Sequence, residues 1–303
     1  MSVKGSSGNV VISISDFITS NTRDDAIRDA GLVTPEDIQR FDDIRYGEDE
    51  RNVLDVYRLK NAGGKLPVIV SVHGGGWVYG NKGIMQYYCM TLAEKGFAVV
   101  NFNYRLSPKH KHPAPIEDAN KVFAWVLAHS EEYGFDVGNI FAVGDSVGAN
   151  ILGLYCCLCT DSAYAERLAI HPPEGFLPKA LGLNCGLYRM AHGENDVLMD
   201  NLAAEYFTEG GTDEEYADIC LAKHVNDKFP PSFIMTALGD FLCVQAKPFY
   251  ELLLSLGVKA EYHCYGTVNN ELKHVFHVDL RLPEAHVCNG DECDFFLRQT
   301  ERT

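Results

Sequence analysis

The sequence predicts an α/β protein in which a mostly parallel sheet is covered by helices on both faces. Three observations lead to this prediction. Short apolar runs, suited to strands buried on both faces, alternate with stretches of helical periodicity along the 303 residues. One run leads directly into Gly144-Asp145-Ser146-Val147-Gly148, a serine between two glycines. Another run, further upstream, leads into His73-Gly74-Gly75-Gly76-Trp77.

The first forty residues are polar and are predicted to be helical. Thr22 can cap a helix over residues 23–30 that ends at Gly31. Thr34-Pro35-Glu36-Asp37 resembles a capping box and predicts the start of a second helix. Because this segment precedes the sheet, we expect it to fold over the sheet.

The sheet is predicted to consist of a hairpin followed by a series of buried strands. Residues 41–46 and 52–58 flank the turn-prone Gly47-Glu48-Asp49-Glu50, which predicts a hairpin at a sheet edge. The helical pattern of residues 116–128 indicates one of the helices that cover the sheet. The buried strands are predicted at residues 66–72, 98–104, 140–143, 180–185, 232–237 and 260–265.

The chain is predicted to form a single domain over residues 1–303 that carries a cap. Residues 188–227 interrupt the alternation of strands and helices with acidic and aromatic sequence, as an insertion would. We therefore expect the cap to be formed by about residues 1–40 and about residues 188–227.

The charge of the chain restricts its partners. There are 26 Lys and Arg against 42 Asp and Glu, a formal net charge of −16. Such a surface repels nucleic acid and anionic membranes, so neither is an expected partner. Residues 1–8 do not resemble a secretion signal, and no apolar run approaches the length of a membrane span. We expect a soluble cytoplasmic protein; a homodimer is compatible with the sequence.

The ten cysteines are expected to be free thiols that bind no metal. Cys156-Cys157-x-Cys159 lies on a predicted helix, where small thiols pack as weak hydrophobes. Cys288-x4-Cys293 lies near His286, but neither group has the paired spacing of a zinc site. No metal site is predicted from these cysteines.

A serine such as Ser146 needs a base to accept its proton and a carboxylate to orient that base. In a sheet of this kind the expected chain order is serine, acid, histidine. Asp240 follows the predicted strand 232–237, so it lies at the sheet edge where such proteins bind ligands. Asp240 is therefore the candidate acid, although an Asp beside a glycine is also a common turn residue.

Two histidines compete for the role of base. His274 comes first after the loop that follows strand 260–265, so its side chain can reach back over the sheet edge. His277 lies about one helical turn further and is more suited to point elsewhere. We favour His274, with a packing or solvated role as the alternative for either residue.

The glycine loop predicts the remaining part of the site. An acyl carbonyl that is attacked gains negative charge on its oxygen, which N–H groups fixed in advance stabilise. The backbone N–H groups of Gly75, Gly76 and Val147 are the candidate donors.

With these motifs, the chain resembles the hormone-sensitive-lipase-like family of α/β-hydrolase carboxylesterases over about residues 53–276. The glycine loop and the serine motif resemble the family's oxyanion loop and its Gly-Asp-Ser-Ala-Gly elbow. Tyr104-Arg105-Leu106-Ser107-Pro108 and Pro113-Ala114-Pro115-Ile116-Glu117-Asp118-Ala119 resemble its intervening signature.

The resemblance implies an α/β-hydrolase fold with an eight-stranded sheet, a helical cap, hydrolysis of short-chain acyl esters and no cofactor. By motif position, it implies Ser146 as nucleophile, Asp240 as acid, His274 as base, and Gly75, Gly76 and Val147 as oxyanion donors.

The chain departs from the family pattern in three places. Val147 replaces the usual alanine and adds bulk beside the nucleophile, which disfavours large acyl groups. Asp240-Phe241-Leu242-Cys243 lacks the charged residues that the family often carries after this aspartate. The loop over residues 266–273 is a few residues longer than expected before the histidine.

The expected function is that of a serine carboxylesterase acting on small acetyl-like or butyryl-like esters through an acyl-enzyme. Trp77, Tyr79 and Tyr188 follow strand ends and are expected near the substrate pocket. An amidase of the arylformamidase type, with the same triad, is the alternative enzyme. A non-catalytic small-molecule receptor is the alternative outside enzymology.

Overall fold

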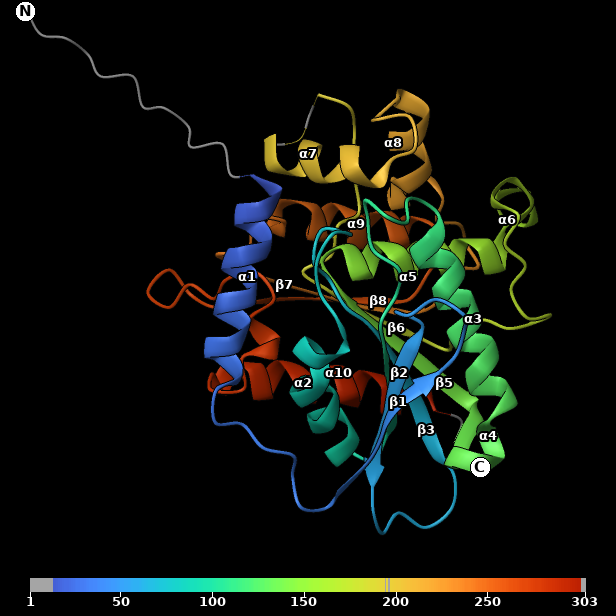
Figure 1. Cartoon of the computed structure of the whole chain (residues 1–303), viewed down its shortest axis with the longest axis vertical. Helices are drawn as coiled ribbons and strands as arrows, with labels where there is room; N and C mark the ends of the chain where they lie inside the picture. The colour runs from blue at the N-terminus through green and yellow to red at the C-terminus, as the bar shows by residue number, and fades with distance from the viewer. Residues whose placement is uncertain (1–12, 194, 196, 301–303) are drawn as a thin grey trace, which may run out of the picture.

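The computed structural model describes residues 13–193, 195 and 197–300 of the chain, shown in Figure 1. The predicted cap segments therefore fall partly outside the described residues, at positions 1–12, 194 and 196. Within the described residues, eight strands form one sheet in the order β1-β2-β4-β3-β5-β6-β7-β8. The strand β2 runs antiparallel to both β1 and β4, and the other neighbours are parallel. The predicted mostly parallel sheet is thus confirmed.

The strands are β1 (Ile38–Arg45), β2 (Val53–Leu59), β3 (Leu66–Val72), β4 (Ala98–Phe102), β5 (Phe135–Asp145), β6 (Leu181–Asn184), β7 (Ser232–Ala237) and β8 (Ala260–Tyr265). The α-helices are α1 (Ile14–Asp29), α2 (Lys82–Glu94), α3 (Ala114–Ala128), α4 (Ser130–Tyr133), α5 (Val147–Thr160), α6 (Ser162–Leu168), α7 (Val197–Tyr206), α8 (Asp213–Ile219), α9 (Cys243–Ser255) and α10 (Pro283–Gln299). The short 3-10 helices are η1 (Leu221–Lys223) and η2 (Phe276–Val278).

Helices cover both faces of the sheet. Buried side chains of α2 and α10 pack on one face, and those of α3, α5 and α9 pack on the other (Figure 1). In β3, Val68 and Val70 belong to one core and Ile69 to the other. Because successive side chains of a strand point to opposite faces, a strand covered on both sides needs an almost continuous apolar run.

The N-terminal helix is longer than predicted. The helix α1 begins after Ser13, whose Oγ accepts a hydrogen bond of 3.1 Å from the N–H of Asp16. Thr22 lies inside the helix, and its hydroxyl donates to the carbonyl of Ile18. The prediction of Thr22 as the cap was therefore wrong: a serine nine residues earlier satisfies the free amides of the first turn.

The predicted second helix near residue 34 is not formed. Instead, the strand β1 starts at Ile38 and pairs with β2, with Ile38 opposite Leu59. Pairing with β2 provides hydrogen-bond partners for the backbone N–H and C=O groups of β1. In an isolated short helix, several of these groups would be bonded only to water. Residues 38–40 thus belong to the sheet and not to the cap segment in which they were expected.

The insertion after β6 is helical. Its helices α7 and α8 lie at the top of Figure 1, above the sheet, and α1 runs along the left side of the molecule. The helices α7 and α8 and the short η1 fall within residues 188–227, and α1 contacts α7. The helix α8 starts with a capping box in which Thr212 and Glu215 bond to each other's backbone amides. This reciprocal cap explains why an acidic stretch forms a regular helix here.

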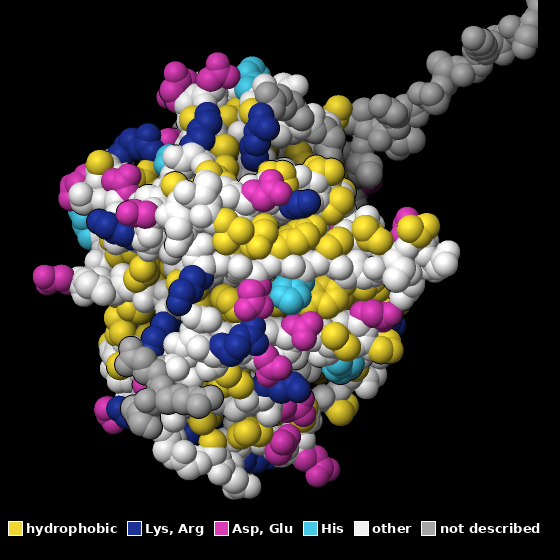
Figure 2. All heavy atoms as spheres, turned by 180° about the vertical axis from the view of Figure 1, so that it is seen from behind, with side chains coloured by type: hydrophobic (Ala, Val, Ile, Leu, Met, Phe, Trp, Pro, Cys, Tyr) yellow, Lys and Arg dark blue, Asp and Glu magenta, His cyan; other side chains and the backbone are white. Residues whose placement is uncertain are grey.

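The surface mixes charges of both signs. On the face opposite to the view of Figure 1, acidic and basic side chains lie interspersed with apolar ones (Figure 2). None of the described helices combines the length and the apolar character needed to cross a bilayer.

Candidate active site

Ser146 lies on a sharp turn between β5 and α5. Its backbone has φ 54° and ψ −121°, a conformation that side-chain-bearing residues seldom adopt. A Cβ atom at Gly144 would come within 2.6 Å of the Gly148 carbonyl oxygen, and one at Gly148 within 2.1 Å of the Val72 oxygen. Glycine is therefore needed at residue 144 for the turn to close on the start of α5, and at residue 148 for the turn to pack against β3.

Ser146 and His274 line one cavity of about 480 Å³. The cavity lies between the sheet edge and the segments expected to form the cap, since α1 and α7 both contribute to its wall. The lining side chains from these two helices are Phe17, Asn21, Asp24, Asp25, Arg28, Leu198, Met199 and Leu202.

Asp240 lies beneath His274 and is held by three hydrogen bonds. Nδ1 of His274 donates to Oδ1 of Asp240 at 2.6 Å. The N–H of Leu242 donates to the same oxygen at 2.9 Å, and the Thr236 hydroxyl donates to Oδ2 at 2.8 Å. Burial opposes ionisation, but these bonds together hold the pKa of Asp240 below its usual value. The carboxylate is thus charged and can orient the imidazole.

Among the residues that the structure describes, no hydrogen bond joins the Ser146 hydroxyl to His274, although both face the same cavity. Such bonds are often loose in enzymes without substrate. His277, the competing histidine, is completely buried on η2 with its ring edge-on to Tyr88. Burial lowers the pKa of His277 to about 3, so its imidazole is neutral. The structure therefore brings His274, and not His277, to the serine.

The glycine loop follows β3 and borders the same cavity. Gly75 and Gly76 have φ of 112° and 60°, and a Cβ at Gly75 would lie 2.2 Å from the Tyr79 carbonyl oxygen. Within the described part of the chain, the N–H groups of Gly75, Gly76 and Val147 donate to no protein acceptor. All three residues line the cavity, so their amides are available to a bound oxyanion.

Buried side chains that sequence reasoning left unassigned hold this loop. Oδ1 of Asp145 accepts the N–H of Gly74 at 3.0 Å. Nδ1 of His73 lies 2.7 Å from the Gly74 oxygen, and its ring stacks on Tyr104 with centroids 4.1 Å apart. Burial lowers the pKa of His73 to about 3. His73 is therefore a neutral residue that supports the loop.

Asp145 is the acidic residue directly before Ser146. It lines the cavity but is only 6% exposed, and burial raises its pKa to about 6 despite the opposing effects of His274 and the Gly74 amide. Asp145 belongs to the serine motif, so its position could be predicted from the sequence. The direction of its side chain could not. The Asp145 side chain points to the glycine loop.

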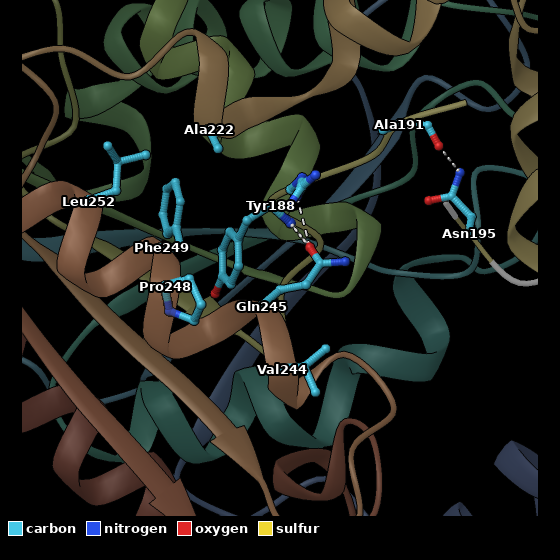
Figure 3. A pocket seen from close by; sticks show the side chains of 10 residues that line it. Tyr188, Ala191, Asn195, Ala222, Val244, Gln245, Pro248, Phe249 and Leu252 are labelled. Carbon is cyan, nitrogen blue, oxygen red and sulfur yellow. Dashed lines mark hydrogen bonds between the residues drawn. The ribbon is translucent and has the colours of Figure 1, made fainter. Parts of the chain in front are cut away.

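Two of the three aromatic residues expected at the substrate pocket do not lie there. Tyr79 lines the cavity, as expected. Trp77 is fully buried and stacks on Tyr206 with centroids 4.7 Å apart. Tyr188 lines a different cavity, of about 410 Å³, where it stacks on Phe249 (Figure 3). The expectation for Trp77 and Tyr188 is corrected, because each ring has a packing partner on a distant helix.

Sequence reasoning missed the polar cluster that α1 brings to the cavity. Arg28 Nη1 pairs with Asp25 Oδ1 at 2.7 Å, and the Tyr79 hydroxyl donates to Asp25 Oδ2 at 2.7 Å. Burial raises the pKa of Asp25, although the Arg28 charge and the Tyr79 hydroxyl oppose the shift. No motif marks these residues; their i, i+3 spacing on one helix face is the only signal in the sequence.

One group of potential metal ligands occurs among the described residues, formed by Cys185, Asp240 and His274 within 4.8 Å of one another. The distance of 2.6 Å between Asp240 and His274 is that of a hydrogen bond. Two ligands that share a zinc ion at about 2.0–2.2 Å each would lie further apart. The group thus fits the orientation of an imidazole better than metal binding.

Comparison with known proteins agrees with this geometry. Residues 69–278 match the family described as alpha/beta hydrolase fold. The chain is 31% identical over 241 residues to tuliposide A-converting enzyme 1 of Tulipa gesneriana, covering 71% of this chain and 57% of that protein. It is 30% identical over 222 residues to the probable carboxylic ester hydrolase LipM of Mycobacterium tuberculosis, covering 70% and 51%.

Solved structures show the same fold. The crystal structure of esterase B from Lactobacillus Rhamnosis superposes with a TM-score of 0.85 at 22% identity, covering 94% of this chain and 93% of the other. The chain spans between 29% and 58% of the length of the curated relatives compared. The chain thus belongs to the α/β-hydrolase fold family, and the predicted resemblance to its hormone-sensitive-lipase-like members is confirmed.

Proposed function

We propose that the protein is a serine carboxylesterase that hydrolyses esters of short-chain acids through an acyl-enzyme on Ser146. One observation carries the proposal. The serine, the Asp240-bound His274 and three N–H groups that donate to no acceptor among the described residues border one cavity of about 480 Å³. This volume suits a small organic molecule. Relatives named as esterases support the same reaction class.

The first half of the reaction forms the acyl-enzyme. The Ser146 Oγ attacks the ester carbonyl carbon while its proton passes to Nε2 of His274. The carbonyl oxygen becomes an anion and accepts N–H bonds from Gly75, Gly76 and Val147. The C–O bond to the alcohol then breaks, and His274 gives its proton to the departing alkoxide. Asp240 keeps the imidazole in the tautomer that this transfer needs.

The second half releases the acid. A water molecule gives a proton to His274 and its oxygen attacks the acyl carbon. The same three amides stabilise the second anion. When the bond to Oγ breaks, the serine regains the proton from His274 and the acid leaves. The reaction thus uses the chain's own side chains and backbone amides together with one water molecule.

The size of the acyl group is limited by the helical segments above the serine. A Cβ atom at Gly76 would lie 2.9 Å from a Leu202 methyl group, so α7 packs closely on the oxyanion loop. The Val147 side chain is buried beside the nucleophile. We infer that α1 and the insertion over residues 188–227 act as a cap, and that this cap favours acetyl and butyryl over long acyl chains.

The test is hydrolysis of p-nitrophenyl acetate, butyrate and decanoate by the wild-type chain, Ser146→Ala and the exposed control Ser255→Ala. We expect turnover of the two short esters, little turnover of decanoate, and a loss of about a thousandfold or more in kcat for Ser146→Ala only. Equal rates for wild type and Ser146→Ala would overturn the mechanism. Hydrolysis of formanilide but of no ester would overturn the substrate class in favour of an amide.

A further inference from the structure

The loop that follows β6 contacts both sides of the catalytic serine. The carbonyl of Asn184 accepts the N–H of Ser146 at 2.9 Å. Three residues later, the N–H of Leu187 donates to the carbonyl of Ser146 at 3.1 Å. The backbone of the nucleophile is thus held on both sides by residues 184–187, a segment that no catalytic motif includes.

The same loop reaches the histidine segment through a side chain. The N–H of Val275, the residue after His274, donates to Sγ of Cys185 at 3.4 Å. This sulfur also lies within 4.8 Å of a carboxylate oxygen of Asp240 and a ring nitrogen of His274. The N–H of Cys185 donates to the Met235 carbonyl at 2.7 Å, which fixes the loop to β7.

Three of the residues that take part in these bonds are in the left-handed region. Ser146, Cys185 and Val275 have φ of 54°, 46° and 52°. This conformation is uncommon for residues with side chains and is a clear outlier for a β-branched valine. Such residues persist only where their surroundings determine their conformation, and they gather at functional sites. Here the loop supplies two backbone hydrogen bonds to Ser146 and a sulfur acceptor to the N–H of Val275.

The chemical state of Cys185 suits an acceptor and not a reactive thiol. The side chain is completely buried, and burial raises the pKa of the thiol well above its ordinary value. A protonated thiol can accept the Val275 N–H through a sulfur lone pair, but it is a poor nucleophile. The Cys185 side chain lies beside the Asp240 and His274 pair. This position suits a residue that supports the segment carrying His274.

We propose that residues 184–187 position the catalytic serine and histidine relative to each other, with Cys185 as the side chain that fixes the histidine segment. The proposal rests on the proposed function in naming Ser146 and His274 as the reacting pair. Cys185 is a positioning residue: it contacts the backbone next to His274 and takes no part in the chemistry.

The test compares Cys185→Ala, Cys185→Ser and Cys156→Ala. Cys185→Ala removes the sulfur that accepts the Val275 N–H, and Cys185→Ser replaces it with a hydroxyl acceptor of shorter reach. Cys156→Ala is the control, because Cys156 is an equally buried thiol in α5. Each variant is assayed for kcat and KM with p-nitrophenyl butyrate, for its melting temperature, and for the rate of labelling by a biotinylated fluorophosphonate. In the labelling step, Ser146 Oγ bonds to phosphorus, fluoride leaves, and the serine proton passes to His274.

We expect Cys185→Ala to lower kcat and the labelling rate at least tenfold with KM within twofold. Cys185→Ser should recover most of both rates, and Cys156→Ala should change neither rate by more than twofold. The proposal is overturned if Cys185→Ala keeps both rates within twofold, or if Cys156→Ala loses as much rate as Cys185→Ala at a comparable melting temperature. It is also overturned if Cys185→Ser recovers neither rate although its melting temperature equals that of the wild type.

The labelling rate separates failure of this inference from failure of the proposed function. A wild-type chain that labels at Ser146 but hydrolyses no ester would contradict the esterase proposal alone. The Cys185 variants would then still be compared by labelling. Mass spectrometry of the labelled peptide identifies the modified serine.

Discussion

Nδ1 of His274 and Oδ1 of Asp240 are 2.6 Å apart, and the acid is buried at the end of β7. The carboxylate is ionised, since the hydrogen bonds to it outweigh the effect of burial on its pKa. Asp240 can therefore hold the imidazole with its other nitrogen turned to the serine and stabilise the charge that His274 gains. Thirty-four positions separate the two residues in sequence, and the parallel pairing of β7 with β8 brings them together.

The first prediction concerns this bond. Asp240→Asn should lower kcat for p-nitrophenyl butyrate by roughly 10³–10⁴-fold, because an amide nitrogen at this position favours the wrong imidazole tautomer. KM should change little. The exposed Asp294→Asn on α10 serves as the control and should keep wild-type kcat. A variant at residue 240 with kcat within tenfold of wild type would contradict the assignment of Asp240.

A second prediction concerns the oxyanion loop. Gly75→Ala places a Cβ within 2.2 Å of the Tyr79 carbonyl oxygen at a φ of 112°, so the loop must shift. We expect kcat to fall by about a hundredfold or more, as for the loss of an oxyanion donor. Gly290→Ala is the matched control: it lies in α10 with open space around it and should stabilise the fold by roughly 0.5–1 kcal/mol. Steady-state kinetics and thermal unfolding of both variants provide the comparison.

Tyr79 and Tyr188 allow a third prediction, because they lie in different cavities. Tyr79→Phe removes the bond to Asp25 at the cavity wall and should raise KM for p-nitrophenyl butyrate several-fold. Tyr188→Phe removes a buried bond to the Leu183 carbonyl and should lower the free energy of unfolding by about 1 kcal/mol with little change in KM. The reverse pattern, a KM effect at Tyr188 alone, would show that the substrate occupies the other cavity.

The fourth prediction concerns pH. Glu292 on α10 is buried; it accepts the Tyr88 hydroxyl at 2.5 Å and the Asn184 side-chain amide at 2.8 Å. Burial raises its pKa to about 7, although both hydrogen bonds oppose the shift. Since the unfolded chain releases this proton near pH 4.5, the contribution of Glu292 to stability is complete below that pH and is lost as the pH rises through 7.

Glutamine mimics the protonated form, so Glu292→Gln should lack this loss. Between pH 4.5 and pH 8, the unfolding free energy of the wild type should fall relative to Glu292→Gln by on the order of 3 kcal/mol. Chemical denaturation at the two pH values measures the change, with the exposed Glu214→Gln as control. An equal difference in unfolding free energy between the wild type and Glu292→Gln at both pH values would contradict the raised pKa of Glu292.

Several strands could be predicted from the sequence to the residue. The predicted strands at 66–72, 232–237 and 260–265 have the observed bounds of β3, β7 and β8. The strand β5 extends beyond its apolar part over residues 140–143 in both directions. Phe135 and Asp136 pair with β3 across an irregularity in register, and Asp145 pairs with β6. Pairing of this kind depends on a neighbouring strand and leaves little trace in local composition.

Ser146 and the glycine loop could be placed because their motifs fix the backbone conformation locally, and Asp240 and His274 because they follow predicted strands. The directions of the Trp77 and Tyr188 side chains could not, since they depend on Tyr206 in α7 and Phe249 in α9. The polar cluster of Asp25 and Arg28 could not be predicted either, because nothing in the sequence of α1 shows which part of the molecule this helix covers.

Two glycines in the turn that carries Ser146 leave no room for a side chain. A Cβ atom at Gly144 would meet the backbone of Gly148, and one at Gly148 would meet the backbone of Val72, and main-chain atoms cannot be exchanged by mutation. The walls contributed by α1 and α7, in contrast, consist of side chains such as Phe17, Leu198 and Leu202. Laboratory evolution toward new substrates should therefore accumulate its changes in these two helices, while the reacting centre stays as it is.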